Sequence, residues 1–243
     1  MNRVSICMAT YNGELYVRPQ ILSILAQMNA NDELVIVDDH SNDGTVSILS
    51  IINDSRIRFF QNEKNIGHVQ SFAKAISLAL NPIILMADQD DIWIKDRLKI
   101  MHDSLCDNGV LLVSTNSIFI DASGNPIKPL HSGLRIEDSR RYAKNIVNIF
   151  FGKAFYDGCA MCINREILDY ILPIPRYVES HDLWIAMAAN IAKSNSHLSI
   201  ATLQRRVHGG NASVGKRSFF KKIWSRVVFV ISFAQLSLRI NKF

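Results

Sequence analysis

Short apolar runs alternate with amphipathic stretches through the first third of the chain. The apolar runs are typical of buried strands and lie at Val4–Ala9, Glu33–Val37, Arg56–Phe60 and Ile83–Ala87. The stretches between them place apolar side chains on one helical face, which predicts helices over Glu14–Met28, Asp43–Ile52 and Val69–Leu80. Strands that alternate with helices of this length predict an α/β fold with a mostly parallel sheet and helices on both faces.

The pattern is less regular after Asp91. Three stretches predict further helices: Lys95–Leu105, Glu137–Phe150 and Ser180–Ala192. Three others predict strands, with a loop over Val207–Lys216 after the last of them: Val110–Ile120, Ala160–Ile163 and Leu198–Leu203. We therefore divide the chain into residues 1–91, residues 92–215 and a C-terminal tail of residues 216–243.

Charge is spread unevenly along the 243 residues, which are 48% hydrophobic and 20% charged and so can form a packed core. The net charge is +5. The segment from Leu183 to Phe243 contains ten basic residues and no acidic residue, whereas the first 182 residues carry 17 basic against 22 acidic side chains. A basic C-terminal segment on an acidic body predicts an anionic partner, either nucleic acid or anionic lipid.

The tail interleaves its basic residues with aromatic ones, namely Phe219, Phe220, Trp224, Phe229 and Phe233. Twelve uncharged residues separate Arg226 from Arg239, fewer than the ~20 apolar residues that span a bilayer. We expect a basic amphipathic helix that lies in the interface of an anionic membrane, and the alternative is a helix packed on the body with a solvated basic face. No nucleic-acid motif accompanies the charge, so we expect no nucleic-acid partner.

The cysteines and the N-terminus indicate a reducing compartment. Cys159 and Cys162 form a C-x-x-C pair, but no second pair completes a zinc site, and the pair does not follow a first strand as it would in a thioredoxin. We expect all four cysteines, which include Cys7 and Cys106, to be free thiols. The start of the chain, MNRVSICMATYNGE, has no apolar segment long enough for a signal peptide, so the expected location is cytoplasmic.

Three carboxylates follow the fourth predicted strand in the sequence Asp88-Gln89-Asp90-Asp91. In open α/β sheets, ligands bind at the carboxyl ends of the strands. Three acids in four residues repel one another unless a cation or water screens them, and hard oxygen ligands at this spacing suit Mg²⁺ or Mn²⁺ that carries a diphosphate. The alternative is a solvated acidic turn that caps the next helix.

Two other strand ends carry polar side chains. After the second strand, in VDDHSNDGT, Asp39 is placed to accept hydrogen bonds from a base or ribose. The same residues also suit an ordinary turn in which Ser41 or Asp43 caps the following helix. After the first strand, in ATYNG, the Tyr11 ring offers a stacking face for a nucleobase, although a plain turn explains this segment equally well.

Together with later motifs, these strand ends resemble the family-two glycosyltransferases with a GT-A fold. The matching stretches cover roughly residues 3–215 in order: VSICMATYNGELYVRPQILSILAQ, DELVIVDDHSNDGT, NEKNIGHVQSFAKAI, ILMADQDDIW, GCAMCINREIL, ESHDLWIAMAA and RRVHGGNAS. The resemblance points to bacterial enzymes that build O-antigen and other surface polysaccharides, including a rhamnosyltransferase-like group. It implies a Rossmann-like sheet, a nucleotide-sugar-binding half at 1–91 and an acceptor-binding and catalytic-base half at 92–215.

The resemblance also implies an activity. An inverting, metal-dependent transferase would move a hexose from a nucleotide sugar to a sugar carried on polyprenyl diphosphate, in O-antigen or lipopolysaccharide biosynthesis. UDP-glucose or UDP-galactose is the first expected donor, and dTDP-rhamnose is the next. The tail would hold such an enzyme peripherally on the inner face of the cell membrane, against anionic lipids.

Donor-side roles follow from the same resemblance. The residues that would bind the donor are Thr10, Tyr11 and Asp39 at the nucleoside, with Asp88, Asp91 and Arg206 nearer the sugar and diphosphate. Asp90, which forms the family's DxD element with Asp88, would be the direct ligand of Mn²⁺ or Mg²⁺. His208, in the late Arg-x-His element with Arg206, would either bind the metal or contact the diphosphate.

Asp182 matches the catalytic base of inverting members, which takes the proton from the attacking hydroxyl. The preceding His181 would be either a surface or helix-cap residue or an acceptor contact. This chain has Arg205-Arg206-Val207-His208 where relatives commonly have Tyr-Arg-Gln-His, and His-Asp-Leu-Trp where they often have His-Asp-Trp-Trp. These departures indicate that its acceptor contacts differ from those of its relatives.

Two other classes of protein share some of these features. A Mg²⁺-dependent nucleotidyltransferase or phosphohydrolase would have similar acidic strand ends, but many nucleotidyltransferases carry a Gly-rich basic loop where this chain has ATYNG. A non-catalytic membrane-docking protein on the same fold would be expected to lack Asp90 or Asp182, and both are present. The sequence therefore favours the transferase.

Overall fold

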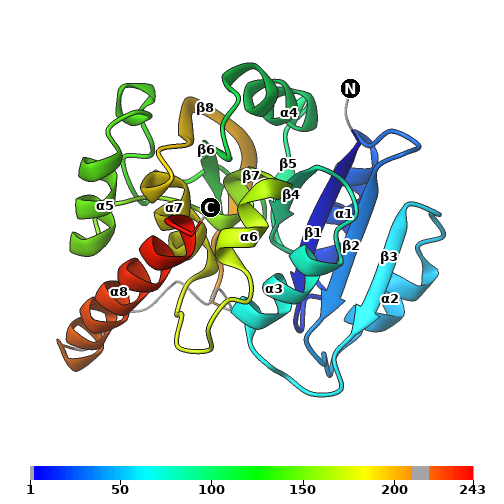
Figure 1. Cartoon of the computed structure of the whole chain (residues 1–243). Coiled ribbons are helices and arrows are strands. Elements are labelled where there is room, and N and C mark those ends of the chain that lie inside the picture. The colour runs from blue at the N-terminus through cyan, green and yellow to red at the C-terminus, as the bar shows by residue number, and fades with distance from the viewer. Residues whose placement is uncertain (1–2, 210–218, 243) are drawn as a thin grey trace.

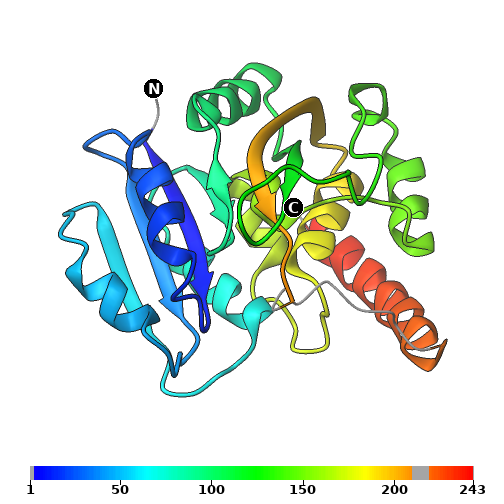
Figure 2. The same ribbon diagram turned by 180° about the vertical axis from the view of Figure 1, so that it is seen from behind.

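One eight-stranded sheet runs through the protein, with helices against both of its faces (Figures 1 and 2). The computed structural model describes residues 3–209 and 219–242. The strand order is β3-β2-β1-β4-β7-β6-β8-β5. The strands are β1 (Val4–Thr10), β2 (Glu33–Asp38), β3 (Ile57–Gln61), β4 (Ile83–Ala87), β5 (Ile92–Trp93), β6 (Leu112–Ile120), β7 (Met161–Asn164) and β8 (Asn195–Arg206). The division of the chain at residue 91 stays a prediction, and the sheet continues across it.

Strands β1 to β4 pair in parallel, and their side chains alternate between two cores. Helices α1 (Val17–Leu25) and α2 (Thr45–Ile51) cover one face, and α3 (His68–Leu78) covers the other. On β2, Leu34 and Ile36 belong to the core under α1, whereas Val35 and Val37 belong to the core under α3. Because both faces are buried, these strands are continuous apolar runs in the sequence.

The second half of the sheet is mixed. Strand β7 is antiparallel to both of its neighbours, β4 and β6, while β8 runs parallel to β6 and the short β5 pairs antiparallel with β8. The helical elements are α4 (Arg97–Asn108), η1 (Ile136–Asp138), α5 (Tyr142–Phe151), η2 (Gly158–Ala160), η3 (Arg165–Ile167), α6 (Leu168–Ile171) and α7 (His181–Ile191). Since β6 and β8 run in the direction of β4, the carboxyl ends of all three strands lie at one edge of the sheet.

Several predicted elements differ from the structure in extent. The first helix is limited to Val17–Leu25, and the helix expected from Glu137 divides into η1 and α5. The last strand is twice as long as its apolar core suggested, since it runs from Asn195 to Arg206. No pattern predicts β5, because two residues are too few for a periodicity. Most of the loop expected over residues 207–216 lies outside the described residues.

The described part of the tail forms one long helix, α8 (Phe219–Ile240), beside α5 and α7 (Figure 1). One face packs on α6 and α7 and buries Val228, Ser232 and Leu236. The other face exposes large apolar side chains, namely Phe220, Ile223, Trp224, Val227, Val230, Ile231 and Leu238. The helix therefore packs on the body and still presents an apolar surface outward.

The tail was predicted to be too short to span a membrane, but the length and composition of α8 do not support this prediction. The helix Phe220–Ile240 is long and apolar enough to do so by length and composition only, since an 18-residue window within it has a mean hydropathy of 1.4. The prediction counted only the residues between Arg226 and Arg239, whereas the helix carries these charges within a longer apolar stretch. Arg239 fixes α8 to the body, because its guanidinium donates to the carbonyls of Tyr170 and Pro173 at 2.9 and 3.0 Å.

Candidate active site

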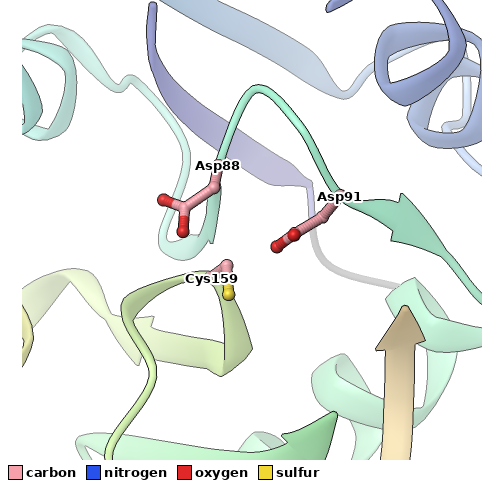
Figure 3. Close-up of side chains that lie close together, drawn as sticks. All are labelled: Asp88, Asp91 and Cys159. Atoms are coloured by element: carbon pink, nitrogen blue, oxygen red, sulfur yellow. The ribbon is translucent and has the colours of Figure 1, made fainter. Parts of the chain in front are cut away.

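Acidic side chains gather where β4 ends. Carboxylate oxygens of Asp88 and Asp91 and the Sγ atom of Cys159, from η2, lie within 4.8 Å of one another (Figure 3). Asp91 is 1% exposed, and its Oδ1 accepts a hydrogen bond from the Arg206 N–H at 3.0 Å. Its Oδ2 has no hydrogen-bond partner in residues 3–209 and 219–242. A buried carboxylate oxygen without a partner is unfavourable, which favours a cation or a proton here.

The acids raise one another's pKa. Burial, followed by repulsion from Asp90, raises the pKa of Asp88 to about 7. Burial and the charges of Asp88 and Asp90 raise the pKa of Asp91 well above its usual value. The group therefore carries less negative charge near neutral pH than three free carboxylates would, unless a cation binds and keeps them ionised.

Asp90 lies next to His208, which follows it by 118 residues. The His208 Nε2 atom is 2.8 Å from Asp90 Oδ2, and the imidazole packs on the Tyr16 ring with centroids 4.9 Å apart. Neighbouring ligands of an octahedral ion with bonds of ~2.1 Å are separated by about 3 Å, so this spacing fits Mg²⁺ or Mn²⁺. The structure thus brings the two predicted metal ligands together, while the sulfur of Cys159 suits such hard ions poorly.

Arg206 does not point into the group of acids. Its Nε donates to the Asp90 carbonyl at 3.0 Å, and its Nη1 donates to the carbonyls of Asp121 and Ala122 at 3.2 and 3.0 Å. The guanidinium carbon lies 4.7 Å from the centre of the Tyr16 ring. These bonds make Arg206 a support for the backbone of the acidic segment, and its expected contact with a diphosphate stays a prediction.

The neighbouring Arg205 lies among the acids instead. Its Nη1 donates to Asp157 Oδ1 at 2.5 Å, and Asp157 Oδ2 is 3.5 Å from Nε2 of His131. The charge of Arg205 lowers the pKa of Asp88 and of Asp182. Sequence reasoning missed Arg205 and Asp157 as site residues. The available signal was that Arg205 replaces the tyrosine that relatives commonly have.

Asp182 lies in the first turn of α7, whose N-cap is Ser180. The Ser180 hydroxyl donates to Asp182 Oδ1, and the Leu183 N–H donates to the same oxygen at 2.8 Å. Burial raises the pKa of Asp182 to about 6 despite the Leu183 hydrogen bond, and the charge of Asp157 adds to the rise. The charge of Asp182 in turn raises the pKa of Asp88. Asp88 and Asp182 are both half-buried, so the carboxylate on α7 is linked electrostatically to the acids after β4.

His181 is buried, so the expectation of a surface position is wrong. Its ring stacks on Phe72 with centroids 4.2 Å apart, and it fits there because a side chain at Gly158 would begin 2.7 Å from its Nε2. Burial and the neighbouring His68 lower the pKa of His181 to about 3, so the imidazole is neutral. Neither ring nitrogen has a hydrogen-bond partner in the described part of the chain. This leaves hydrogen-bonding capacity beside Asp182.

The polar side chains at the ends of β1 and β2 are largely used within the fold. The Thr10 hydroxyl donates to Asp38 Oδ1 at 2.9 Å. Asp39 accepts from the Asn62 amide at 3.0 Å and from the backbone N–H groups of residues 66–67 at 2.8 Å. Thr10 and Asp39 are both buried. Any nucleoside contact by these two side chains would be additional to these bonds.

Tyr11 is 43% exposed, so its ring is accessible for stacking. The Gln89 side chain closes on the Tyr11 backbone: its Oε1 accepts the N–H at 2.9 Å, and its Nε2 donates to the carbonyl at 3.0 Å. A side chain at Gly13 would collide with Gln89, so this approach requires glycine. Gln89 thereby ties the end of β1 to the end of β4. Sequence reasoning missed this role, because it assigned functions only to the acids on either side of Gln89.

The family model described as Glycosyl transferase family 2 matches residues 5–172. The chain belongs to this family. A UDP-Glc:alpha-D-GlcNAc-diphosphoundecaprenol beta-1,3-glucosyltransferase, WfgD of Escherichia coli, is 34% identical over 113 residues, which are 46% of this chain and 45% of that protein. The dTDP-rhamnosyl transferase RfbG of Shigella flexneri is 32% identical over 173 residues, 66% of this chain and 55% of that protein.

Solved structures share the fold of this family 2 glycosyl transferase. TarS 1-349 of S. aureus in complex with UDP-GlcNAc aligns with a TM-score of 0.70 and 21% identity, over 100% of this chain and 71% of that chain. The mannosyltransferase PcManGT from Pyrobaculum calidifontis, in complex with GDP-Man and Mn²⁺, aligns with a TM-score of 0.63 and 18% identity, over 99% and 74%. The expected GT-A fold is confirmed. The glycosyl transferase spans about half the length of the curated relatives it matches.

Proposed function

We propose that this glycosyl transferase is an inverting, Mn²⁺- or Mg²⁺-dependent enzyme that moves a hexose from a nucleotide sugar to a sugar on polyprenyl diphosphate. The expected donor is UDP-glucose or UDP-galactose, followed by dTDP-rhamnose. The names of two relatives support these classes, since one is a UDP-Glc-dependent enzyme for a diphosphoundecaprenol acceptor and the other is a dTDP-rhamnosyl transferase. The product would serve O-antigen or another surface polysaccharide.

The proposal rests on the shared environment of the acids after β4 and Asp182. Inverting transfer needs negative charge on the leaving diphosphate to be offset on one side, and a base to take the acceptor proton on the other. The charge of Asp182 acts on Asp88, and both side chains are half-buried, which supports a common site for them. With a pKa of about 6, Asp182 is mostly ionised at neutral pH and can accept that proton.

The surrounding residues support each of these tasks. A divalent cation held by Asp90 and His208 would offset the charge that develops on the leaving diphosphate. Arg205 lowers the pKa of both Asp88 and Asp182 and so favours their ionised forms. The exposed Tyr11 ring would stack on the nucleobase, with Thr10 and Asp39 behind it. Asp91 and Arg206 would contribute to the donor-binding side by holding the acidic segment in place.

Helix α8 supports a peripheral position on the inner face of the cell membrane. Its outward face is apolar, and Lys221, Lys222 and Arg226 lie towards its N-terminal end. In this arrangement, the apolar side chains enter the membrane interface while the cations contact anionic lipids of the cytoplasmic leaflet. Lys216 and Arg217, which belong to the same predicted tail, lie outside the described residues.

A donor screen tests the proposal. The purified protein is offered UDP-glucose, UDP-galactose or dTDP-rhamnose with a polyprenyl-diphosphate-sugar analogue, in Mn²⁺ or in EDTA. We expect one hexose to be added with inverted anomeric configuration, free nucleoside diphosphate to be released, and EDTA to abolish transfer. Release of pyrophosphate or phosphate would point to nucleotidyl transfer or phosphohydrolysis. Donor binding without any transfer would point to non-catalytic docking.

A further inference from the structure

A cleft lies between α5 and residues 132–138, and none of the residues assigned above to the active site lines it. Its volume is about 210 Å³. Three cations, Arg135, Lys144 and Lys153, line it together with one carboxylate, Asp138. Phe155 forms its wall towards the active site, where its ring stacks on His131 with centroids 4.6 Å apart. The stacked rings of Phe155 and His131 thus connect the cleft with Asp157, which lies 3.5 Å from His131.

The charges in the cleft do not balance. Asp138 is occupied by Lys144 at 2.7 Å and by Arg141 at 3.4 Å. The side chains of Arg135 and Lys153 have no hydrogen bond or ion pair within residues 3–209 and 219–242. The wall formed by the buried Tyr156 and His197 adds no charge, because burial lowers the pKa of His197. A cleft with excess positive charge and a rigid polar wall suits an anion.

The volume of the cleft and its position in the fold indicate which kind of anion it would bind. Pockets for drug-sized ligands measure ~300–1,000 Å³, so this smaller cleft suits a group such as a diphosphate. The other side of α5 faces outward with Val147 and Phe151, which are 51% and 58% exposed. The end of α5 meets α8 where the rings of Phe150 and Phe229 lie 5.2 Å apart. The cleft therefore lies beside the apolar surface formed by α5 and α8.

We infer that the cleft between α5 and residues 132–138 binds the diphosphate of a membrane-anchored acceptor. This inference rests on the proposed function. Arg135 and Lys153 would donate charge-assisted hydrogen bonds to the phosphate oxygens. The lipid would follow the outward faces of α5 and α8, and the acceptor sugar would extend past Phe155 and His131 towards Asp182. Along that path His131 lies 3.5 Å from Asp157, whose charge raises the pKa of Asp182.

Two variants, Lys153→Gln and Arg135→Gln, test the cleft with a pair of acceptors. Both acceptors carry the same lipid and sugar, but one joins them through diphosphate and the other through an uncharged ether. We expect each variant to raise the KM of the diphosphate acceptor about tenfold, the effect of one lost charge-assisted hydrogen bond, while the donor KM stays within about twofold. The KM of the ether acceptor should be the same in wild type and variants.

Lys99→Gln is the matched control, because it removes an exposed α4 cation that pairs only with Asp103 in the described part of the chain. It should leave both acceptor KM values at the wild-type level. Unchanged KM for the diphosphate acceptor in Lys153→Gln and Arg135→Gln, with transfer intact, would overturn the cleft and leave the proposed function standing. Failure of the wild type to transfer any hexose would instead remove the proposed function.

A binding titration decides the question independently of turnover and separates free from lipid-anchored diphosphate. Inorganic diphosphate is titrated while nucleoside diphosphate saturates the donor site. Binding that Lys153→Gln weakens about tenfold supports the cleft, and equal binding in wild type and variant overturns it. Tighter binding of the lipid-linked diphosphate than of the inorganic ion would identify the anchored form as the preferred ligand.

Discussion

The parallel and mixed halves of the sheet use the polar side chains at their edges differently. In the parallel half, Thr10, Asp38 and Asp39 bind one another and nearby backbone. In the mixed half and its junction with β4, Asp91 Oδ2 and both nitrogens of His181 are buried without a partner in the part of the chain that the structure describes. Such groups are unfavourable for folding and are concentrated at functional sites. The strand ends of the parallel half therefore act mainly as a scaffold, and we expect the chemistry in the mixed half and its junction with β4.

The strongest test of this contrast is Asp182→Asn. We expect turnover to fall at least ~100-fold, because the amide cannot accept the acceptor proton. Stability at pH 7.5 should rise, not fall. The folded carboxyl has a pKa of about 6, above its ordinary value of 3.8, so its ionisation lowers stability as pH increases through that interval.

Turnover and urea midpoints, measured on the same preparations, check both parts of this prediction. Asp169→Asn, which changes an exposed carboxylate on α6, is the matched control and should leave turnover unchanged. Near-normal turnover in Asp182→Asn would reject the base assignment, and a large loss of stability would reject the view that this edge is strained for function.

Asp39→Ala probes the parallel half of the same edge. Three donors, from Asn62 and residues 66–67, would lose their acceptor, so the free energy of unfolding should fall by about 2 kcal/mol. Urea denaturation measures this loss. Asp39→Asn, which keeps one acceptor oxygen, should lose less. Wild-type stability in Asp39→Ala would show that this carboxylate is not part of the scaffold.

Arg205→Met sharpens the electrostatic side of the comparison. In the wild type, kcat/KM should fall below pH about 6, where Asp182 takes up a proton. Arg205 lowers the pKa of Asp182 and Asp157 raises it, so loss of the guanidinium should move this acidic limb upward by roughly one pH unit. A pH profile of kcat/KM shows the shift, and activity should recover at pH 8.5. If the acidic side of the kcat/KM profile does not move in Arg205→Met, Arg205 does not set the ionisation of Asp182.

The smallest expected effect concerns Mn²⁺ and thermal stability. The pKa of Asp88 is raised to about 7 and that of Asp91 is raised well above its ordinary value, because burial and neighbouring charges disfavour the ionised forms. The metal-free protein should therefore lose stability as the pH rises from about 4 to 7. Mn²⁺ should restore part of it and raise Tm by a few degrees at pH 7.5, but less at pH 5.5, where protons compete. Asp90→Ala should reduce the gain. An equal gain at both pH values would contradict binding by these acids.

The sequence predicts the parallel half well and the mixed half less well for a physical reason. Strands β1, β2 and β4 are buried on both faces, so each is an uninterrupted apolar run. Burial along β8 is irregular, with two adjacent exposed residues and two adjacent buried ones, and its register shifts near Asn116 of β6. No simple period therefore marks its limits. The two residues of β5 are strand only because β8 lies beside them.

Only those residues of the candidate site that belong to a short sequence motif could be predicted. The acids after β4 and Asp182 follow from motifs, but the motif does not tell which of Arg205 and Arg206 faces the acids. Neighbouring residues on a strand point to opposite faces, and the orientation depends on how β8 packs. The burial of His181 depends in the same way on the room left by Gly158, which lies far from it in the sequence.

Helix α8 is also part of the internal packing, because the completely buried Leu236 belongs to the same core as Trp184 of α7. The outward-facing helix and the helix that carries Asp182 are therefore built on shared internal packing. Removing residues 219–242 to obtain a more soluble protein would remove the packing partners of Trp184 and loosen the turn that holds Asp182. A soluble version is better sought by replacing the outward side chains, such as Phe220 and Leu238, with polar ones and leaving the inward face untouched.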